Sequence, residues 1–141
     1  MANVTVDALN VRPMQGAIPA KAEMAAATTL GTVVRLGADG KAYLASAASA
    51  AGASGQLAII VAGSRHYANP TGEVAAGEVV TLIPFGEMYL GTDAALDPTK
   101  PYYLGVDGAI SDAPGTVARF LGYPTSSTKL FFNPTATLPS S

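Results

Sequence analysis

The sequence contains no cysteine and no tryptophan, and only one of its 141 residues is a histidine. Without cysteine the chain can form no disulfide framework, no thiolate metal site and no thiol nucleophile. A single imidazole supplies only one metal ligand, which disfavours a histidine-based metal site as well. We therefore expect no metal and no cofactor.

Charge is also scarce, because charged residues make up 13% of the chain and the formal net charge is −2. Lysine and arginine occur singly and never form the basic stripe that nucleic acid requires, so we expect no nucleic-acid partner. No apolar run approaches the ~20 residues of a membrane span, and the first residues do not resemble a signal peptide. We expect synthesis in the cytoplasm, no membrane association, and a surface largely covered by protein partners.

Glycine and proline are plentiful, with 15 and 10 residues, and they punctuate short β-prone runs. In Gly31–Leu44 two such runs surround a turn that contains Asp39 and Gly40, a pattern that predicts a β-hairpin. The pattern returns around Asp107 and Gly108. We predict that these four residues form turns and do not bind a ligand.

The other β-prone runs follow at intervals of ~8–12 residues, a spacing that predicts an all-β fold, a small sandwich or barrel with few or no helices. The predicted strands are Thr32–Leu36, Lys41–Ala45, Gln56–Ala62, Glu78–Pro84, Glu87–Leu90, Tyr102–Leu104, Ala109–Ser111, Val117–Tyr123 and Lys129–Phe132.

Three segments of the chain carry more specific predictions. Gln56–Ala62 is almost continuously apolar, which predicts burial on both faces of the strand. Ala45–Gly55, the Ala/Ser-rich loop, has nothing to bury and is predicted to be mobile. Pro84–Gly86 predicts a bend or bulge that separates two strands.

The chain divides into an extended N-terminal arm (residues 1–28), a single β domain (29–134) and a C-terminal coil (135–141). Prolines break the arm twice, so we expect it to have weak structure of its own. Ala20–Thr29 leaves a short helix open as an alternative. Such an arm can become ordered by adding a strand to a neighbour's sheet edge.

Six aromatic residues lie in the last third of the chain, and two pairs of them are adjacent in sequence, Tyr102-Tyr103 and Phe131-Phe132. Neighbouring residues on a strand point to opposite faces of the sheet. One member of each pair therefore faces away from the core, as expected if both faces are covered, for example by subunit packing.

Candidate chemistry is sparse. His66 would need a nucleophile held by the fold, and Ser64 is too near in sequence for the usual geometry. A pair of carboxylates, Glu73 with Glu78 or Glu87, stays open as a glycosidase site, although no tryptophan can form a sugar platform. No phosphate-binding glycine motif is present. We expect no catalytic residues and no enzymatic activity.

Several segments in order resemble the capsid decoration (cement) proteins of tailed bacteriophages, of the lambda head-decoration type. They are a strand that enters Leu-Gly-Ala-Asp-Gly, the Ala/Ser-rich loop, an apolar strand, Gly72–Val80, a glycine bend, Tyr102–Leu104, Gly122 and Lys129–Phe132. The likeness covers about Leu30–Asn133. It implies a β-tulip-like body that assembles as a homotrimer on the outside of the virion, at three-fold or quasi-three-fold positions. There it binds the major capsid protein and cements neighbouring capsomers.

The resemblance implies a capsid contact through the N-terminal segment. We assign this role to seven residues of the predicted arm, which are Val4, Val6, Leu9, Val11, Arg12, Met14 and Ile18. The alternative is a virion appendage or tail-associated module that binds host glycans through the polar loop Gly63–Gly72. Arg65, His66 and Tyr67 would be its surface contacts.

Overall fold

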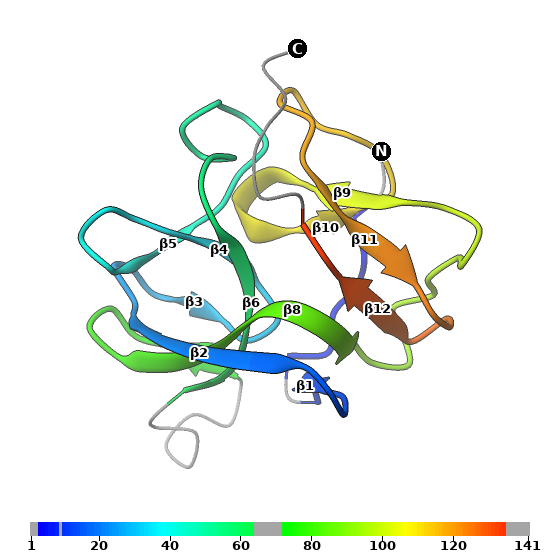
Figure 1. The fold of residues 1–141 in the computed structure, drawn as a ribbon, viewed down its shortest axis with the longest axis horizontal. Helices are drawn as coiled ribbons and strands as arrows, with labels where there is room; N and C mark the ends of the chain where they lie inside the picture. Colours follow the sequence, from blue (N-terminus) through cyan, green and yellow to red (C-terminus); the bar gives the residue numbers. More distant parts are fainter. Residues whose placement is uncertain (1–2, 9, 64–71, 135–141) are drawn as a thin grey trace.

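The computed structural model describes residues 3–8, 10–63 and 72–134 (Figure 1). Strands make up 43% of the chain, and no α-helix is present among the described residues. A 3-10 turn, η2 (Val106–Gly108), interrupts the strands once in the part of the chain that is described. The predicted all-β fold is confirmed, and its main sheet is strongly curled into a half-barrel.

Twelve strands are described, in chain order β1 (Arg12–Pro13), β2 (Ile18–Glu23), β3 (Thr28–Thr29), β4 (Val33–Leu36), β5 (Ala42–Leu44), β6 (Leu57–Gly63), β7 (Glu73–Val74), β8 (Val79–Tyr89), β9 (Tyr102–Leu104), β10 (Ile110–Ser111), β11 (Phe120–Pro124) and β12 (Lys129–Phe132). The main sheet has the order β10-β9-β11-β12-β8-β6-β4-β5, and β1 and β2 both pair with β8. β3 and β7 form a separate two-stranded ladder.

Both predicted Asp-Gly hairpins are present. β4 pairs with β5, with Leu36 opposite Ala42 across the first turn. β9 pairs with β10, with Leu104 opposite Ile110 across the second turn. Local turn chemistry was sufficient to predict both pairings, because a short loop fixes which residues stand opposite each other.

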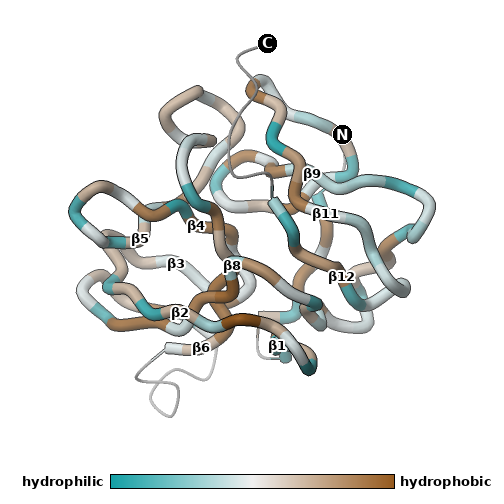
Figure 2. The backbone as a smooth tube through the Cα atoms, in the orientation of Figure 1, coloured by the Kyte–Doolittle hydropathy of each residue, from teal (hydrophilic) through white to brown (hydrophobic). Residues whose placement is uncertain are grey.

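The β6 strand separates two hydrophobic cores, as its apolar sequence predicts. Leu57, Ile59 and Val61 point into the larger core. Ala58 and Ile60 point into the smaller one. Figure 2 shows hydrophobic positions concentrated along β6 and the adjoining part of β8. The prediction of burial on both faces is confirmed.

The β8 strand differs from the expectation, because the two predicted runs form one strand of 11 residues that bends in the middle. Ile18 and Ala20 of β2 are two positions apart, whereas their partners Phe85 and Leu82 on β8 are three positions apart. β8 therefore carries one extra residue here. Such a bulge reverses the alternation of side chains along a strand. The bend at Pro84–Gly86 was predicted correctly, whereas the separation into two strands was wrong.

The reversal decides which residues of β8 are buried. Even-numbered residues change sides at the bend. Val80 and Leu82, which precede it, point into the smaller core, whereas Met88, which follows it, points into the larger core. The odd-numbered Glu87 and Tyr89 are only half-buried and therefore face outward.

The described part of residues 1–28 is not a separate arm, which corrects the expectation. β1 and β2 pair with β8 along almost its whole length. The alternative helix over Ala20–Thr29 is also wrong, because β2 alternates half-buried Ala20 and Ala22 with exposed Lys21 and Glu23. This period of two fits a half-buried strand and not a helix.

Glycines in the body provide the space in which the N-terminal segment lies. A Cβ atom on Gly31 would stand 2.5 Å from Cγ1 of Val6. A Cβ atom on Gly86 would stand 2.5 Å from Cα of Ala17. Backbone segments can approach this closely only where a side chain is missing. The segment is thus packed into the same body as the strands that follow it.

The Ala/Ser-rich loop is anchored, which corrects the expectation that it has nothing to bury. Its side chains Ala47 and Ala53 are fully buried in the larger core. The guanidinium of Arg119, itself only 1% exposed, donates hydrogen bonds to the carbonyls of Ala53 (2.6 Å) and Gly55 (2.8 Å). Burial lowers the pKa of Arg119, but an arginine remains charged. Small side chains allowed close packing that hydropathy alone did not indicate.

Replacing Gly86 with alanine is expected to destabilise the protein, because the new Cβ would collide with the backbone of Ala17 at a residue with φ of +133°. Backbone strain alone costs about 1–3 kcal/mol, and the collision adds to it. Gly77→Ala is the matched control, since its φ is +83° but nothing lies within 4 Å. Urea unfolding followed by circular dichroism would measure both. Equal losses in the two variants would contradict the close contact.

Replacing Arg119 with methionine is expected to lower the free energy of unfolding, because hydrogen bonds from a charged donor contribute about 1.5–3 kcal/mol each. The amides of the Ala/Ser-rich loop should then exchange their hydrogens faster. Lys100→Met, at an exposed position, is the control. Unchanged exchange in the loop of the Arg119 variant would show that the guanidinium does not anchor it.

Candidate interaction surface

Five aromatic side chains form a continuous row on the outside of the main sheet, across β8, β12, β11 and β9. We call this row the aromatic face; its members are Phe85, Phe131, Tyr123, Phe120 and Tyr103. Ring centroids are 5.3 Å apart for Phe85 and Phe131, 5.6 Å for Phe120 and Tyr123, and 6.3 Å for Tyr103 and Phe120. Tyr123 stands opposite Phe131 in the ladder, which closes the row.

The alternation of the strands places these rings outside. Phe132 and Tyr102 are buried in the larger core, at 0% and 4% exposure. Their neighbours Phe131 and Tyr103 are only half-buried. The prediction that one member of each adjacent pair faces away from the core is confirmed.

Two irregularities complete the row. The register between β11 and β9 shifts between Phe120 and Gly122, which brings Phe120 beside Tyr123 although the two are three residues apart. The bulge in β8 turns Phe85 outward. Ordinary alternation would have separated these rings, so the aromatic face depends on the bulges.

The aromatic face is well exposed and continues onto β2. Tyr123 is 52% exposed, Phe85 39%, and Ile18, the ladder partner of Phe85, 56%. Contiguous apolar side chains of this kind mark sites of protein interaction, because water contact is unfavourable for them. Aromatic residues are also enriched in the centres of protein interfaces.

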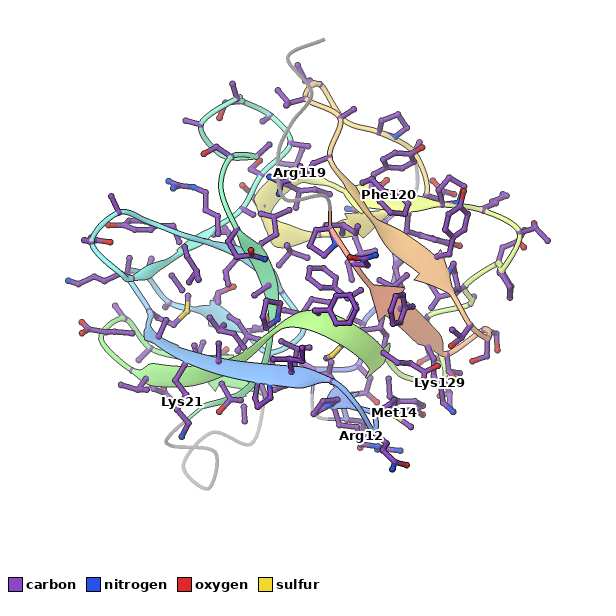
Figure 3. All side chains as sticks on the ribbon, viewed as in Figure 1. Arg12, Met14, Lys21, Arg119, Phe120 and Lys129 are labelled. Atoms are coloured by element: carbon purple, nitrogen blue, oxygen red, sulfur yellow. The ribbon has the colours of Figure 1, made fainter. Side chains whose placement is uncertain are left out.

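Two cations stand at one end of the aromatic face. Arg12 and Lys129 are the ladder partners of Tyr89 on its two sides, and the guanidinium carbon of Arg12 lies 4.3 Å from the Tyr89 ring centroid. Figure 3 shows Arg12 and Lys129 near one another, with Met14 beside them. Among the described residues, no carboxylate lies within 4.0 Å of either cation, and the recorded salt bridge joins Lys41 to Glu23.

One carboxylate, that of Glu87, lies within the aromatic face. Glu87 is the ladder partner of Phe131, and its carboxylate accepts a hydrogen bond from the hydroxyl of Thr125. This bond satisfies part of the hydrogen-bonding capacity of the Glu87 carboxylate. This pairing lowers the cost of covering them with a partner.

The predicted capsid-contact residues divide into two groups. Val4 and Val6 pack against the larger core, and Val11 belongs to it at 6% exposure, so these three hold the segment to its own body. Leu9 lies outside the described residues.

The remaining three are at the surface. Arg12 and Ile18 are exposed and Met14 is half-buried. Arg12 stands at the cationic end of the aromatic face, and Ile18 extends the face beyond Phe85. The structure thus joins part of the predicted contact segment to aromatic residues that are more than 60 positions away in sequence.

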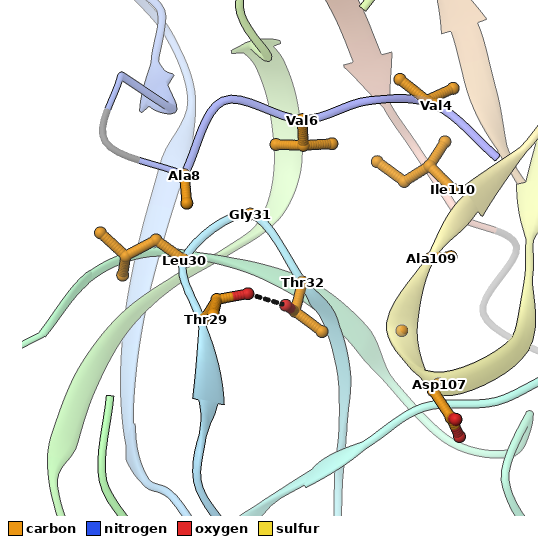
Figure 4. A pocket seen from close by; sticks show the side chains of 11 residues that line it. Val4, Val6, Ala8, Thr29, Leu30, Gly31, Thr32, Asp107, Ala109 and Ile110 are labelled. Carbon is orange, nitrogen blue, oxygen red and sulfur yellow. Dashed lines mark hydrogen bonds between the residues drawn. The ribbon is translucent and has the colours of Figure 1, made fainter. Parts of the chain in front are cut away.

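A shallow hollow of about 170 Å³ lies beneath the first residues (Figure 4). It is lined by Val4, Val6, Ala8, Thr29, Leu30, Gly31, Thr32, Asp107, Gly108, Ala109 and Ile110. Its side-chain polar groups are two threonine hydroxyls 3.2 Å apart and the carboxylate of Asp107. This set lacks the convergent nucleophile, base and orienting group that catalysis requires.

The predicted turn residues close their turns. The carboxylate of Asp39 accepts hydrogen bonds from the amide of Lys41 (3.0 Å) and the hydroxyl of Tyr43 (2.5 Å). These bonds, chiefly that from Tyr43, hold the pKa of Asp39 below its ordinary value and raise the pKa of Tyr43. Gly40, Asp107 and Gly108 have positive φ angles of 82°, 55° and 79°.

The carboxylates predicted as a glycosidase pair have different surroundings. Glu73 is exposed on β7, and Glu78 is buried just before β8, where its carboxylate accepts a hydrogen bond from the amide of Ala75 (3.0 Å). Glu87 lies toward the other end of β8, where its carboxylate accepts a hydrogen bond from the hydroxyl of Thr125. No group of three acidic or histidine side chains within residues 3–8, 10–63 and 72–134 could hold a metal ion.

The predicted contact loop, which contains Arg65, His66 and Tyr67, lies outside the described residues. No described helix is long and apolar enough to cross a membrane.

No family model matches the chain, and no curated protein sequence matches it. Function is therefore inferred from the described surface, on which the aromatic face carries two of the exposed large hydrophobic side chains, Phe85 and Tyr123, with Ile18 beside them. Sequence reasoning found the adjacent aromatic pairs but not the row, because the row depends on bulges and on pairing between distant strands. It also missed that Arg12 and Lys129 flank Tyr89, because this arrangement depends on pairing between distant strands.

Replacing Tyr43 with phenylalanine is expected to raise the pKa of Asp39 toward its ordinary value, because the strongest hydrogen bond to the carboxylate is removed. The folded-state pKa of Asp39 is lowered, so its contribution to stability is present above the ordinary carboxyl pKa and is lost as pH falls through the lowered one. Carboxyl-carbon NMR titration would measure the change. Asp97, whose pKa is lowered chiefly by the Thr99 hydroxyl, is the internal control and should not move. An unchanged Asp39 titration would contradict the assignment.

Proposed function

We propose that this chain is a structural virion protein that binds the outer surface of a tailed-bacteriophage capsid and cements neighbouring capsomers. We further propose that it acts as a homotrimer at three-fold or quasi-three-fold positions, with the major capsid protein as its partner. The observation that carries the proposal is the exposed apolar surface that runs from the aromatic face to Ile18 at the edge of β2, which supplies contacts both between copies and to the shell.

The composition of the molecule supports an adhesive role. Cementing requires a rigid body and large contact surfaces, and it requires no reactive groups. The main sheet joins ten strands, and only 13% of the residues are charged. A protein whose surface is covered by partners needs few charged residues to stay in solution.

The position of the N-terminal segment changes how the capsid contact is proposed to form. The segment is already part of the body, so we propose attachment through side chains on a rigid surface, with Met14 and Ile18 at its edge. Addition of a capsid strand to β2 is disfavoured, because β2 carries Pro19 and Lys21. Proline and lysine are the residues with which natural proteins protect sheet edges from strand addition.

Trimerisation would strengthen such a contact without any new chemistry. Three linked surfaces bind a shell with high effective concentration once the first has attached, so weak individual contacts suffice. This property also explains why each contact can be small.

The purified chain is expected to cosediment with heads of the phage that encodes it, when those heads have been prepared without the chain. Quantitative mass spectrometry should find a copy number comparable to that of the major capsid protein, and decorated heads should resist heating better than bare ones. A few copies per particle would instead indicate a tail component. Failure to bind heads together with binding to a host polysaccharide would overturn the proposal in favour of the glycan-binding alternative.

A further inference from the structure

The aromatic face has the composition of a permanent protein interface. Its centre consists of five aromatic rings and of one carboxylate, Glu87, that is bonded to Thr125. Its free charges, Arg12 and Lys129, stand at one end. In protein interfaces aromatic residues are likewise enriched at the centre and charged residues are depleted there, and Glu87 is the one exception within this face.

We propose that the aromatic face is buried against a second copy of this chain and is the contact that holds the homotrimer together. This inference rests on the proposed function, to which it adds the surface that joins the copies. It leaves Met14 and Ile18, at the edge of the sheet beside the aromatic face, for the capsid.

A second copy suits the aromatic face better than the capsid shell does. The shell is met only after the chain has folded, and until then an uncovered aromatic row would contact water or promote aggregation. Other copies are present from synthesis onward. Interfaces between permanent partners are accordingly more apolar than those between partners that meet later.

The charges also favour a second copy, in a head-to-tail arrangement. Arg12 and Lys129 have no carboxylate within reach among the described residues of their own chain. Asp107 is exposed on η2, which packs beside β4 and not on the aromatic face, and no bond to its carboxylate is recorded within the described residues. A contact between the cationic rim of one copy and this acidic turn of the next would pair opposite charges. Contacts between two different surfaces close into a ring, such as a trimer, when the rotation from one copy to the next returns to the first.

Replacing Tyr123 with lysine tests the inference at the most exposed ring. Tyr123 is 52% exposed, so lysine can replace it with little effect on the fold, yet it would place a charge in the centre of the contact. Val79→Lys is the matched control, because Val79 is 48% exposed on β8 before the bend, away from the aromatic face. Sedimentation equilibrium would give the mass of each protein over a range of concentrations, and circular dichroism would verify folding.

The wild-type chain and Val79→Lys are expected to sediment at three times the 14.2 kDa mass of one chain. Tyr123→Lys should remain folded and associate at least about 30-fold more weakly, as for loss of a central interface residue. Should Tyr123→Lys fail to fold, Phe85→Ser, which removes a ring that is 39% exposed, provides the second variant. A wild-type chain that sediments as a single copy at all concentrations would overturn the inference, as would face variants that stay trimeric.

The same proteins, tested for binding to undecorated heads, separate this inference from the proposed function. Trimeric face variants that no longer bind heads would assign the aromatic face to the shell, which overturns the inference and supports decoration. A wild-type trimer that dissociates on face substitution but never binds heads would support the inference and contradict decoration.

Discussion

The bend in β8 is the constraint on which the rest of the structure depends. Four strands, β1, β2, β6 and β12, pair with β8, and its two halves border different cores. The extra residue near Pro84 reverses the alternation, so Met88 enters the larger core while Glu87 and Tyr89 face outward. Without the reversal, a carboxylate would point into the core, at a cost that no partner there would offset. The same reversal turns Phe85 toward Phe131 and so begins the aromatic face.

Close backbone contact is the second determinant, and it changes the functional interpretation. Gly31 and Gly86 leave space for Val6 and Ala17, so the N-terminal segment is packed as the edge of the body. A tethered arm would bind by becoming ordered, and it would lose conformational entropy at that step. A segment that is ordered beforehand avoids that loss, which favours attachment through a rigid surface.

The aromatic face and the N-terminal edge together suggest how one small body could serve two contacts. In the proposed arrangement, the aromatic face joins the copies, and the edge that carries Ile18 and Met14 meets the shell. Cementing depends on such a division, because a molecule that bridges capsomers must hold its own copies together while it holds the shell.

The sequence by itself determined the all-β class, both Asp-Gly hairpins, the burial of β6 on two faces and the outward position of one residue in each aromatic pair. These features follow from local rules, since turn chemistry and the alternation of side chains act over a few residues. Only the tertiary structure decided that Arg12–Pro13 and Ile18–Glu23 join the main sheet, that Arg119 anchors the Ala/Ser-rich loop and that Phe85 meets Phe131. Each of these depends on bulges or on contacts between residues far apart in the chain, which periodicity cannot encode.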